Sequence, residues 1–400
     1  MFKLINTCQN YLWGRKGGAD NLVYQFFKAQ DASTQPNTED PYAEYWMGCH
    51  PKSFSQILVD GDQRKPVAEY LKENNLEGLP YLFKILSIAS CLSLQAHPNK
   101  ELAKVLHEKD PANYPDANHK PEMCVALTDF RAFCNFCPKI ELVDNFKRYQ
   151  CVYEKLKAQI DKLDQSSSED ESKQAFKELF LAINDLPISV ISQLRDEAKA
   201  KPDQTIREEV LADIIETYPE DISVVSTLSL NIIDLGKGSA FVMNPHEPHS
   251  YIKGEIMEVM ALSDNVVRLG LTPKFKDYDT LVQMLTWDMG KKDLVKPQEH
   301  PQNGLTYSTY RPEGYEEFEC VVIDGKLEAD KQGKFSTGFH AILANFGSEA
   351  KFTLADGKEL TLQKHETLFV LKDQTVTITS ASDVFIVICT KNGQDMIKPE

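Results

Sequence analysis

The chain has 400 residues, of which 42% are hydrophobic and 10% aromatic, and its formal net charge at pH 7 is −16. This length predicts two or three domains with large cores, and no apolar run approaches the roughly 18 to 20 residues that a membrane span requires. The negative charge argues against nucleic acid or an anionic membrane as a partner.

The nine cysteines are odd in number and scattered along the chain. The N-terminal residues lack the apolar run of a signal peptide, so reduced thiols and a cytoplasmic location are expected. Cys134 and Cys137 have Cys-x-x-Cys spacing, but no second pair completes a zinc knuckle. We therefore expect most cysteines to be core residues.

Two stretches rich in aromatic residues and glycine, 9–18 and 41–51, come first along the chain. This composition is typical of turns and of the edge of a pocket, where glycine lets the backbone bend and aromatic rings present flat surface. Trp13 and Trp46 are therefore candidates for a pocket edge, with plain strand packing as an equal alternative.

One lysine interrupts the apolar run 81–89. A buried ammonium is costly without a partner, so Lys84 either meets such a partner or points to solvent from an edge strand. The residues alone slightly favour the edge strand.

Residues 92–97 alternate between apolar and polar side chains, which predicts a strand with Ser93, Gln95 and His97 on one face. Gln95 and His97 can bind one ion from that strand, and Glu122 is expected on the next strand. An amide oxygen, an imidazole and a carboxylate suit a borderline cation such as zinc, with a fourth ligand still required. A hydrogen-bonded polar pair is the alternative for an isolated Gln-x-His sequence.

A short amphipathic helix is predicted over residues 99–107, with Lys100 at its start and facing the same side as Ser93. Residues 110–121 are rich in proline, asparagine and aspartate, which predicts a loop. This loop would deliver His119, Lys120 and Glu122 to the site.

Helical spacing of apolar residues replaces alternation between residues 143 and 218 and predicts a helical insertion. Residues 164–171 are polar and acidic, and they are interpreted as a solvated linker between two of its helices. Alternation returns at Val224.

The segment after the insertion offers two histidines and two cations. His249 is the better candidate for a metal ligand because Pro248 stiffens the backbone before it, whereas His246 lies in an exposed-looking turn. Arg268 and Lys274 lie among small and turn-forming residues, which indicates a site for an anion or an oxyanion.

Short strands separated by turns follow from about residue 301 and predict a second β-sandwich or jelly roll. The predicted strands are 318–323, 341–344, 352–354, 360–362, 368–371, 376–378 and 384–389. No metal is expected among them, because His340 and His365 have no candidate ligands nearby.

Several separate motifs resemble one known family in sequence and in order. They are Asn10-Tyr-Leu-Trp-Gly, Ala43-Glu-Tyr-Trp-Met-Gly-Cys-His-Pro, Leu92-Ser-Leu-Gln-Ala-His-Pro, Asn118-His-Lys-Pro-Glu-Met, Pro248-His-Ser-Tyr and Ser263-Asp-Asn-Val-Val-Arg-Leu-Gly-Leu-Thr-Pro-Lys-Phe. Together they strongly resemble the type I mannose-6-phosphate isomerases, and the resemblance extends from about residue 8 to about residue 285.

The resemblance implies a zinc-dependent enzyme that interconverts D-mannose 6-phosphate and D-fructose 6-phosphate through an enediol(ate), feeding GDP-mannose synthesis and mannose metabolism. It implies a mainly β fold of cupin or jelly-roll β-sandwich domains with an α-helical insertion. The expected segments are 1–142 and 223–300 for the catalytic cupin domain, 143–222 for the helical insertion and 301–400 for a C-terminal jelly roll. A monomer is expected, with a small sugar phosphate as ligand and with neither nucleic acid nor a membrane as partner.

Carried over residue by residue, the resemblance assigns one zinc ion to Gln95, His97, Glu122 and His249, and a catalytic role to Arg268. In such a site zinc polarises a sugar oxygen and the arginine stabilises the enediolate. The resemblance assigns phosphate-side and pocket positions to Ser93, Lys100 and Lys274, and further substrate contacts nearby to Trp13, Lys84, Lys120, Glu258 and Asp264.

The chain departs from the family pattern at three places. Leu269 stands where the family usually has alanine, Tyr45 and Cys49 stand in one motif where leucine and threonine are usual, and residues 244–247 replace a more apolar stretch. None of these changes removes a proposed ligand, but the larger Leu269 could alter how Arg268 is presented.

Two other functions compete with this interpretation. A non-haem iron oxygenase on a cupin fold expects two histidines and a carboxylate with open positions, and the additional Gln95 and the lysines disfavour it. A non-catalytic sugar-phosphate sensor would lack a ligand or Arg268, and every such position is filled.

Overall fold

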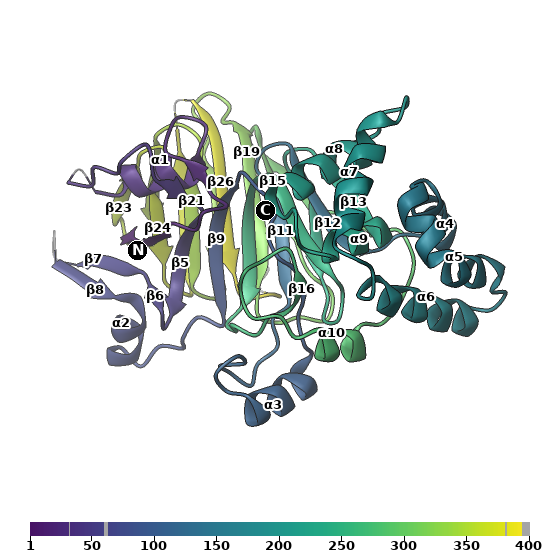
Figure 1. Ribbon diagram of the computed structural model, residues 1–400. Coiled ribbons are helices and arrows are strands. Elements are labelled where there is room, and N and C mark those ends of the chain that lie inside the picture. The colour runs from purple at the N-terminus through teal and green to yellow at the C-terminus, as the bar shows by residue number, and fades with distance from the viewer. Residues whose placement is uncertain (32, 60–62, 381, 394–400) are drawn as a thin grey trace.

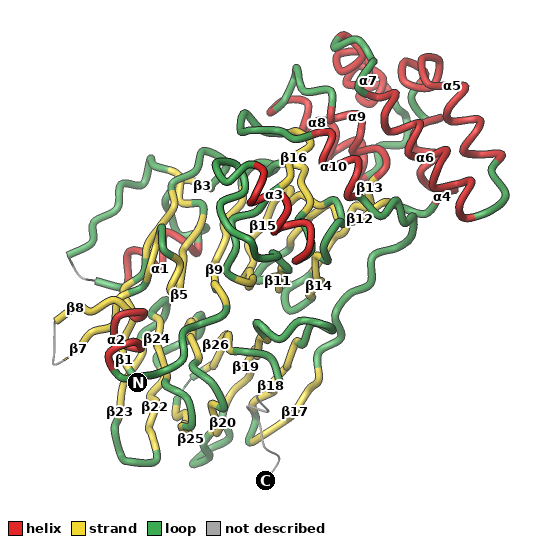
Figure 2. Tube along the Cα trace, turned by 90° about the horizontal axis from the view of Figure 1, so that it is seen from below, coloured by secondary structure: helices red, strands yellow, loops and turns green. Residues whose placement is uncertain are grey.

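A computed structural model describes residues 1–31, 33–59, 63–380 and 382–393 of the chain (Figures 1 and 2). Figure 1 shows antiparallel sheets through most of the molecule and a group of helices at one end. The predicted mainly β fold with a helical insertion is confirmed.

An eleven-stranded sheet carries the segments in which the metal ligands are predicted. Its main path runs β13 (Leu230–Leu235), β12 (Phe130–Phe136), β15 (His249–Ala261), β9 (Tyr81–Ile88), β5 (Glu44–His50) and β2 (Thr7–Gln9). The strands off this path are β6 (Ser53–Phe54), β10 (Leu94–Ala96), β11 (Glu122–Ala126), β14 (Ala240–Met243) and β16 (Val267–Gly270).

A nine-stranded sheet joins the two ends of the sequence. Its order is β17 (Gln298–Gln302), β18 (Leu305–Tyr310), β19 (Glu319–Lys326), β26 (Asp383–Thr390), β21 (Ala341–Asn345), β24 (Thr367–Val370), β1 (Phe2–Ile5), β7 (Gln56–Val59) and β8 (Gln63–Pro66). Strand β1 therefore lies between a strand from the C-terminal region and one from the N-terminal region. The division of the chain into four segments stays a prediction.

Two smaller sheets complete the β-structure. One contains β20 (Gly333–Thr337), β25 (Gln374–Thr379), β22 (Ala350–Leu354) and β23 (Glu359–Leu362), and the other pairs β3 (Arg15–Lys16) with β4 (Pro41–Tyr42). All seven strands predicted after residue 301 are present at nearly the expected positions.

Most helices lie within or directly beside the predicted insertion at residues 143–222, and Figure 2 shows them at one corner of the molecule. They are α4 (Lys139–Lys147), α5 (Gln150–Gln165), α6 (Glu169–Ile183), α7 (Ser189–Ala200), α8 (Ile206–Thr217) and α9 (Ser223–Ser226), followed by a 3-10 turn at Thr227–Ser229. The others are α1 (Leu22–Ala29), α2 (Val67–Glu73), α3 (Lys100–Lys109) and α10 (Tyr278–Met284). None of the described helices has the length and apolar character needed to cross a membrane.

The predicted acidic linker at residues 164–171 is shorter than expected. Helix α5 extends to Gln165 and α6 begins at Glu169, so only three residues separate the helices. Ser168 caps α6 in a capping box with Glu171, and its side chain accepts a hydrogen bond from the Glu171 backbone N–H. Acidic residues favour the first turn of a helix, which explains why part of the acidic run is helical.

The helical insertion packs against the back of the strands that carry Gln95 and Arg268. Leu94 and Ala96 of β10 lie in one buried core with the apolar faces of α4 to α8, and so do Val267 and Leu269 of β16. Because side chains alternate across a strand, this packing turns Gln95 and Arg268 to the opposite face. The larger side chain of Leu269 therefore packs on the insertion side, away from the face that carries Arg268.

Candidate metal centre and sugar-phosphate site

Three strands bring the central residues of the site into one row. Gln95 on β10 lies directly opposite His249 on β15, and it also lies opposite Arg268 on β16. Opposed residues in antiparallel strands place their side chains on the same face. The register of β10 therefore sets two proposed ligands beside the proposed catalytic arginine.

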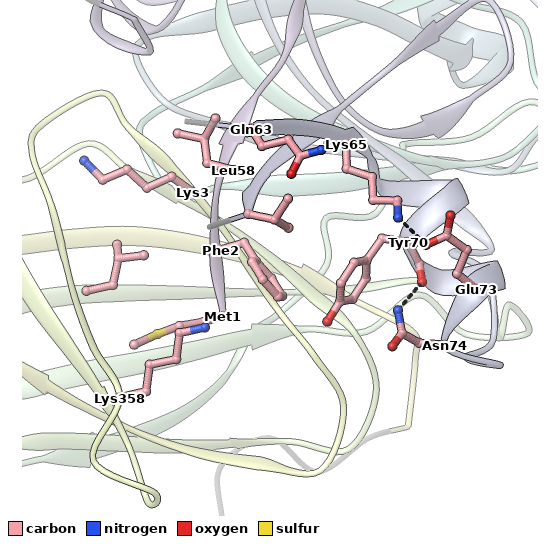
Figure 3. A pocket seen from close by; sticks show the side chains of 12 residues that line it. Met1, Phe2, Lys3, Leu58, Gln63, Lys65, Tyr70, Glu73, Asn74 and Lys358 are labelled. Carbon is pink, nitrogen blue, oxygen red and sulfur yellow. Dashed lines mark hydrogen bonds and ion pairs between the residues drawn. The ribbon is translucent and has the colours of Figure 1, made fainter. Parts of the chain in front are cut away.

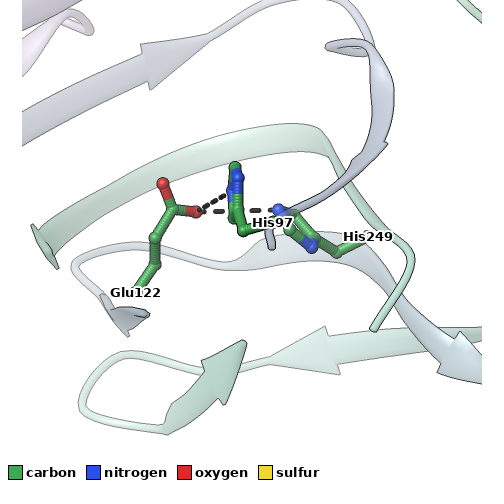
Figure 4. Close-up of side chains that lie close together, drawn as sticks. All are labelled: His97, Glu122 and His249. Carbon is green, nitrogen blue, oxygen red and sulfur yellow. Dashed lines mark ion pairs between the residues drawn. The ribbon is translucent and has the colours of Figure 1, made fainter. Parts of the chain in front are cut away.

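A carboxylate and two imidazoles converge beside this row (Figure 4). Oε2 of Glu122 lies 3.3 Å from Nε2 of His97 and 3.6 Å from Nε2 of His249. The three potential ligand atoms lie within 4.8 Å of one another, and all three residues are buried. The three side chains can thus contact one ion.

Backbone carbonyls orient both imidazole rings. Nδ1 of His97 lies 2.9 Å from the carbonyl oxygen of Asn265, and Nδ1 of His249 lies 3.0 Å from that of Glu247. A carbonyl only accepts hydrogen bonds, so each Nδ1 carries the proton and each Nε2 keeps a lone pair. Nε2 of His97 has no hydrogen-bond partner in the described part of the chain.

Burial and charge set the protonation states that a metal requires. Burial lowers the pKa of His97, and burial together with His97 lowers the pKa of His249 to about 3, so both rings are neutral at pH 7. Burial alone would raise the pKa of Glu122, but the ammonium of Lys120 holds it well below its usual range. The site therefore offers two neutral imidazoles and an ionised carboxylate.

Gln95 can complete this set of ligands. Its Nε2 lies 3.5 Å from Nε2 of His249, and its Oε1 accepts a hydrogen bond of 2.7 Å from the hydroxyl of Ser93. A half-turn of the amide exchanges the oxygen and the nitrogen at little steric cost. The oxygen would then face the same point as the two imidazoles.

The prediction that Lys84 points to solvent from an edge strand is wrong. Strand β9 lies between β15 and β5, and Nζ of Lys84 is buried 2.9 Å from Glu258 and 3.5 Å from Glu44. Its ammonium also lies 4.9 Å from the centre of the Trp46 ring. Burial would lower the pKa of Lys84, but the two carboxylates outweigh burial and raise it, so the lysine is charged.

The partners of this lysine extend its network. Trp46 donates a hydrogen bond of 2.6 Å from Nε1 to Glu44, and the hydroxyl of Tyr251 donates one of 2.7 Å to Glu258. Trp46 is therefore buried within the sheet and also donates a hydrogen bond to the carboxylate of Glu44. Burial raises the pKa of Glu258, and Lys84 opposes that effect.

Asp264 and Lys274 have partners of their own. Asp264 lies 3.3 Å from Nε2 of His50 and 2.7 Å from Nζ of Lys52. Burial would raise the pKa of Asp264, but hydrogen bonds from these two residues hold it well below its usual range. The ammonium of Lys274 lies 4.9 Å from the centre of the Tyr11 ring.

The remaining predicted residues lie around these groups. Lys120 pairs with Oε1 of the carboxylate of Glu122. Trp13 is half-buried and stacks on Tyr11, with 5.8 Å between the ring centres. Lys100 is the first residue of α3 and pairs with Glu317, whose carboxylate lies 3.5 Å away.

A separate cavity lies away from these residues (Figure 3). It has a volume of about 670 Å³ and lies between β1, the β7–β8 pair, α2 and the turn before β23. Two of its lysines already have carboxylate partners, since Lys3 pairs with Glu366 and Lys65 with Glu73. None of the predicted site residues lines it.

Comparison with known proteins identifies the family. A family model for the catalytic domain of type I phosphomannose isomerase matches residues 1–139. The mannose-6-phosphate isomerase of Rattus norvegicus is 39% identical over 78% of this chain and 79% of its own length. That of Saccharomyces cerevisiae is 34% identical over 96% of this chain and 97% of its own length. The chain belongs to the type I phosphomannose isomerase family.

Solved structures of phosphomannose isomerases share the fold over nearly the whole chain. A crystal structure of a zinc-bound mannose 6-phosphate isomerase is 28% identical, with a TM-score of 0.81 over 98% of this chain and 99% of that chain. A variant phosphomannose isomerase from Salmonella typhimurium gives a TM-score of 0.82 over the same shares of the two chains, also at 28% identity. The family resemblance and the fold class predicted from the sequence are thereby confirmed.

In this phosphomannose isomerase family member, several residues near the site escaped the sequence analysis. Glu44, His50 and Glu317 each contact a predicted site residue, whereas His119, which was expected in the same loop as Lys120, pairs with Glu317. Glu44 and His50 lie within a motif that carries the resemblance, so a buried carboxylate near Lys84 was detectable in principle. No local pattern marks Glu317, because its partners come from distant parts of the sequence.

Proposed function

We propose that this protein is a zinc-dependent isomerase that interconverts D-mannose 6-phosphate and D-fructose 6-phosphate. The observation that carries the proposal is the meeting of Glu122 with the Nε2 atoms of His97 and His249 in a buried site. The family membership of the chain supports the same reaction.

The residues present fit a zinc ion. Two imidazole nitrogens, a carboxylate and the amide oxygen of Gln95 would supply four nitrogen and oxygen donors, which suits the tetrahedral preference of zinc. Nε2 of His97 is a buried polar atom with no hydrogen-bond partner among the described residues, as expected of an atom that faces a metal. The other ring nitrogen of each histidine is already used by a carbonyl.

The reaction removes a proton from the carbon beside a carbonyl and returns it to the neighbouring carbon. When bound, zinc supplies a Lewis acid that polarises the sugar oxygen and lowers the cost of its negative charge. Arg268 would stabilise the enediolate oxygen, because it lies beside Gln95 and its buried Nε has no hydrogen-bond partner in the described residues.

The sugar phosphate is proposed to bind to cations and hydrogen-bond donors around this row. Ser93, Lys100 and Lys274 would bind the phosphate, since an acidic protein must gather positive charge locally to hold a dianion. Trp13, Lys84, Lys120, Glu258 and Asp264 are the remaining proposed contacts.

The oligomeric state, the cellular location and the metabolic role of the protein are also proposals. A monomeric protein in the cytoplasm that supplies or consumes mannose 6-phosphate would feed GDP-mannose synthesis and mannose metabolism. The nine cysteines, none of which forms a disulfide, are compatible with a reducing compartment.

A coupled assay of fructose 6-phosphate formation from mannose 6-phosphate tests the function. Activity is expected to disappear after chelation and to return with zinc, and Gln95→Ala and His249→Ala are expected to lose zinc and activity together. Full activity in the metal-free protein would rule out the proposal. No activity in folded, zinc-loaded protein would favour the sugar-phosphate sensor instead.

A further inference from the structure

The segment between β18 and β19 lies against chain segments that flank the proposed metal ligands. The hydroxyl of Tyr315 donates a hydrogen bond of 3.2 Å to Oδ1 of Asn244. Oε1 of Glu317 lies 2.6 Å from Nε2 of His119 and 3.5 Å from Nζ of Lys100. The contacted residues are close in sequence to three of the four proposed ligands: Lys100 follows His97, His119 precedes Glu122 and Asn244 precedes His249.

Glu317 is held firmly in this position. Its side chain is only 17% exposed, and the neighbouring Tyr315 packs its ring edge-on to His119, with 6.0 Å between the ring centres. Asn392 fixes the same segment by donating hydrogen bonds to the carbonyl oxygens of Pro312 and Tyr315. The hydrogen bond from His119 outweighs burial and lowers the pKa of Glu317 to about 2, so the carboxylate is charged at neutral pH.

We propose that Glu317 is a positioning residue for the sugar-phosphate site. Its carboxylate holds Lys100 and His119 in place and competes with the phosphate of the substrate for Lys100. The inference rests on the proposed function, because Lys100 has this role only if a phosphate enters beside it. An incoming dianion must draw the ammonium of Lys100 away from a carboxylate 3.5 Å distant. The C-terminal region would thus set the affinity of the site for phosphate.

Two substitutions separate the charge of Glu317 from its hydrogen bond. Glu317→Gln removes the charge that holds Lys100 but keeps an oxygen that can accept from His119. Glu317→Ala removes both. His119 directly precedes Lys120, the residue that pairs with Glu122, so only the alanine variant should loosen this part of the site.

Binding of inorganic phosphate to the zinc-loaded protein, measured by calorimetry at low ionic strength, tests the role of the charge. Glu317→Gln is expected to bind phosphate about threefold to tenfold more tightly, because the freed Lys100 no longer has a competing carboxylate. The same change in a Lys100→Met background should have no effect. Glu316→Gln is the matched control, since Glu316 is exposed and carries the same charge one residue away.

An unchanged phosphate affinity in Glu317→Gln, or an equal gain in the Lys100→Met background, would overturn the proposal. Kinetics test the contact with His119: kcat is expected to fall at least fivefold further in Glu317→Ala than in Glu317→Gln, and equal values would remove His119 from the proposal. Phosphate binding is measured without turnover, so absence of isomerase activity would count against the proposed function and leave this test intact.

Discussion

Arg268 lies directly opposite Gln95 in the ladder between β16 and β10. Gln95 also lies directly opposite His249 on β15. The arginine, the amide and the imidazole therefore form one row, although the sequence separates Gln95 from the other two by more than 150 residues. Backbone hydrogen bonds of the sheet fix the row, so its geometry does not depend on flexible loops.

Replacing Arg268 with lysine is expected to lower kcat about 100-fold to 1,000-fold, because lysine keeps the charge but loses the planar set of donors. Zinc content is expected to stay the same, since the arginine is not a proposed ligand. Steady-state kinetics and metal analysis measure both quantities. Arg195→Lys is the control, because the Arg195 side chain lies in the helical insertion and is 43% exposed. A loss of kcat below tenfold would contradict the role of Arg268.

Replacing Asn265 with alanine is expected to weaken zinc binding about 10-fold to 100-fold. Its amide donates hydrogen bonds of 2.7 Å and 2.9 Å to the carbonyl oxygens of Asp116 and Asn118, and its own carbonyl orients His97. Competition with a chelator of known affinity measures the change. Asn113→Ala, in an exposed loop, should bind zinc as tightly as the unmodified chain. Equal affinity in both variants would show that Asn265 does not position the ligand.

Replacing Lys84 with methionine is expected to destabilise the fold by about 3 to 5 kcal/mol, because it leaves two buried carboxylates without a counter-charge. Adding Glu258→Gln to this variant should restore part of the loss, since one of the two buried charges is then removed. Chemical denaturation measures the free energy of unfolding of both variants. If the double variant is less stable than Lys84→Met, the pairing of Lys84 with Glu258 does not determine the loss.

Glu208 is expected to make the stability of the helical insertion depend on pH. Burial would raise its pKa, but hydrogen bonds from Arg148, Thr205 and Tyr149 outweigh burial and lower the pKa to about 2. A carboxylate whose pKa falls on folding stabilises the fold above its unfolded pKa of about 4.3, and this contribution is lost as pH falls through the folded value.

The melting temperature of Glu208→Gln should therefore lie below that of the unmodified chain at pH 7, and the gap should narrow as pH falls from about 4.5 towards 2. Thermal denaturation across this range tests the prediction. Glu216→Gln is the control, because Glu216 is an exposed residue of the same helix. A gap that stays constant with pH would assign the effect to packing.

Alternation along residues 92–97 contained enough information to predict which face of β10 carries Gln95 and His97. The structure places Leu94 and Ala96 in one core with the insertion helices. The apolar residues of the pattern therefore pack against helices that come much later in the sequence. The preference for His249 over His246 agrees with the geometry, because Nε2 of His246 accepts a hydrogen bond from the backbone N–H of Asn99 at the start of α3. Zinc binding by these residues stays a prediction.

The position of Lys84 depended on information that a single strand does not hold. Whether β9 lies at an edge is decided by β15 and β5, which pair with it on both sides and supply Glu258 and Glu44. Glu317 presents the same difficulty, since its partner His119 lies 198 residues away in the sequence. Local periodicity identifies the face of a strand, whereas such partners follow only from the order of the strands in the sheet.

Strand β1 pairs with β24, with Phe2 opposite Phe369, and with β7 on its other side. Strand β1 can therefore complete its ladder only after Phe369 of β24 has been synthesised. Until then its unpaired edge is exposed to other chains, which makes early truncated products prone to aggregation. Completion of this sheet therefore comes late in synthesis, because β1 is paired on both sides only after β24 has emerged.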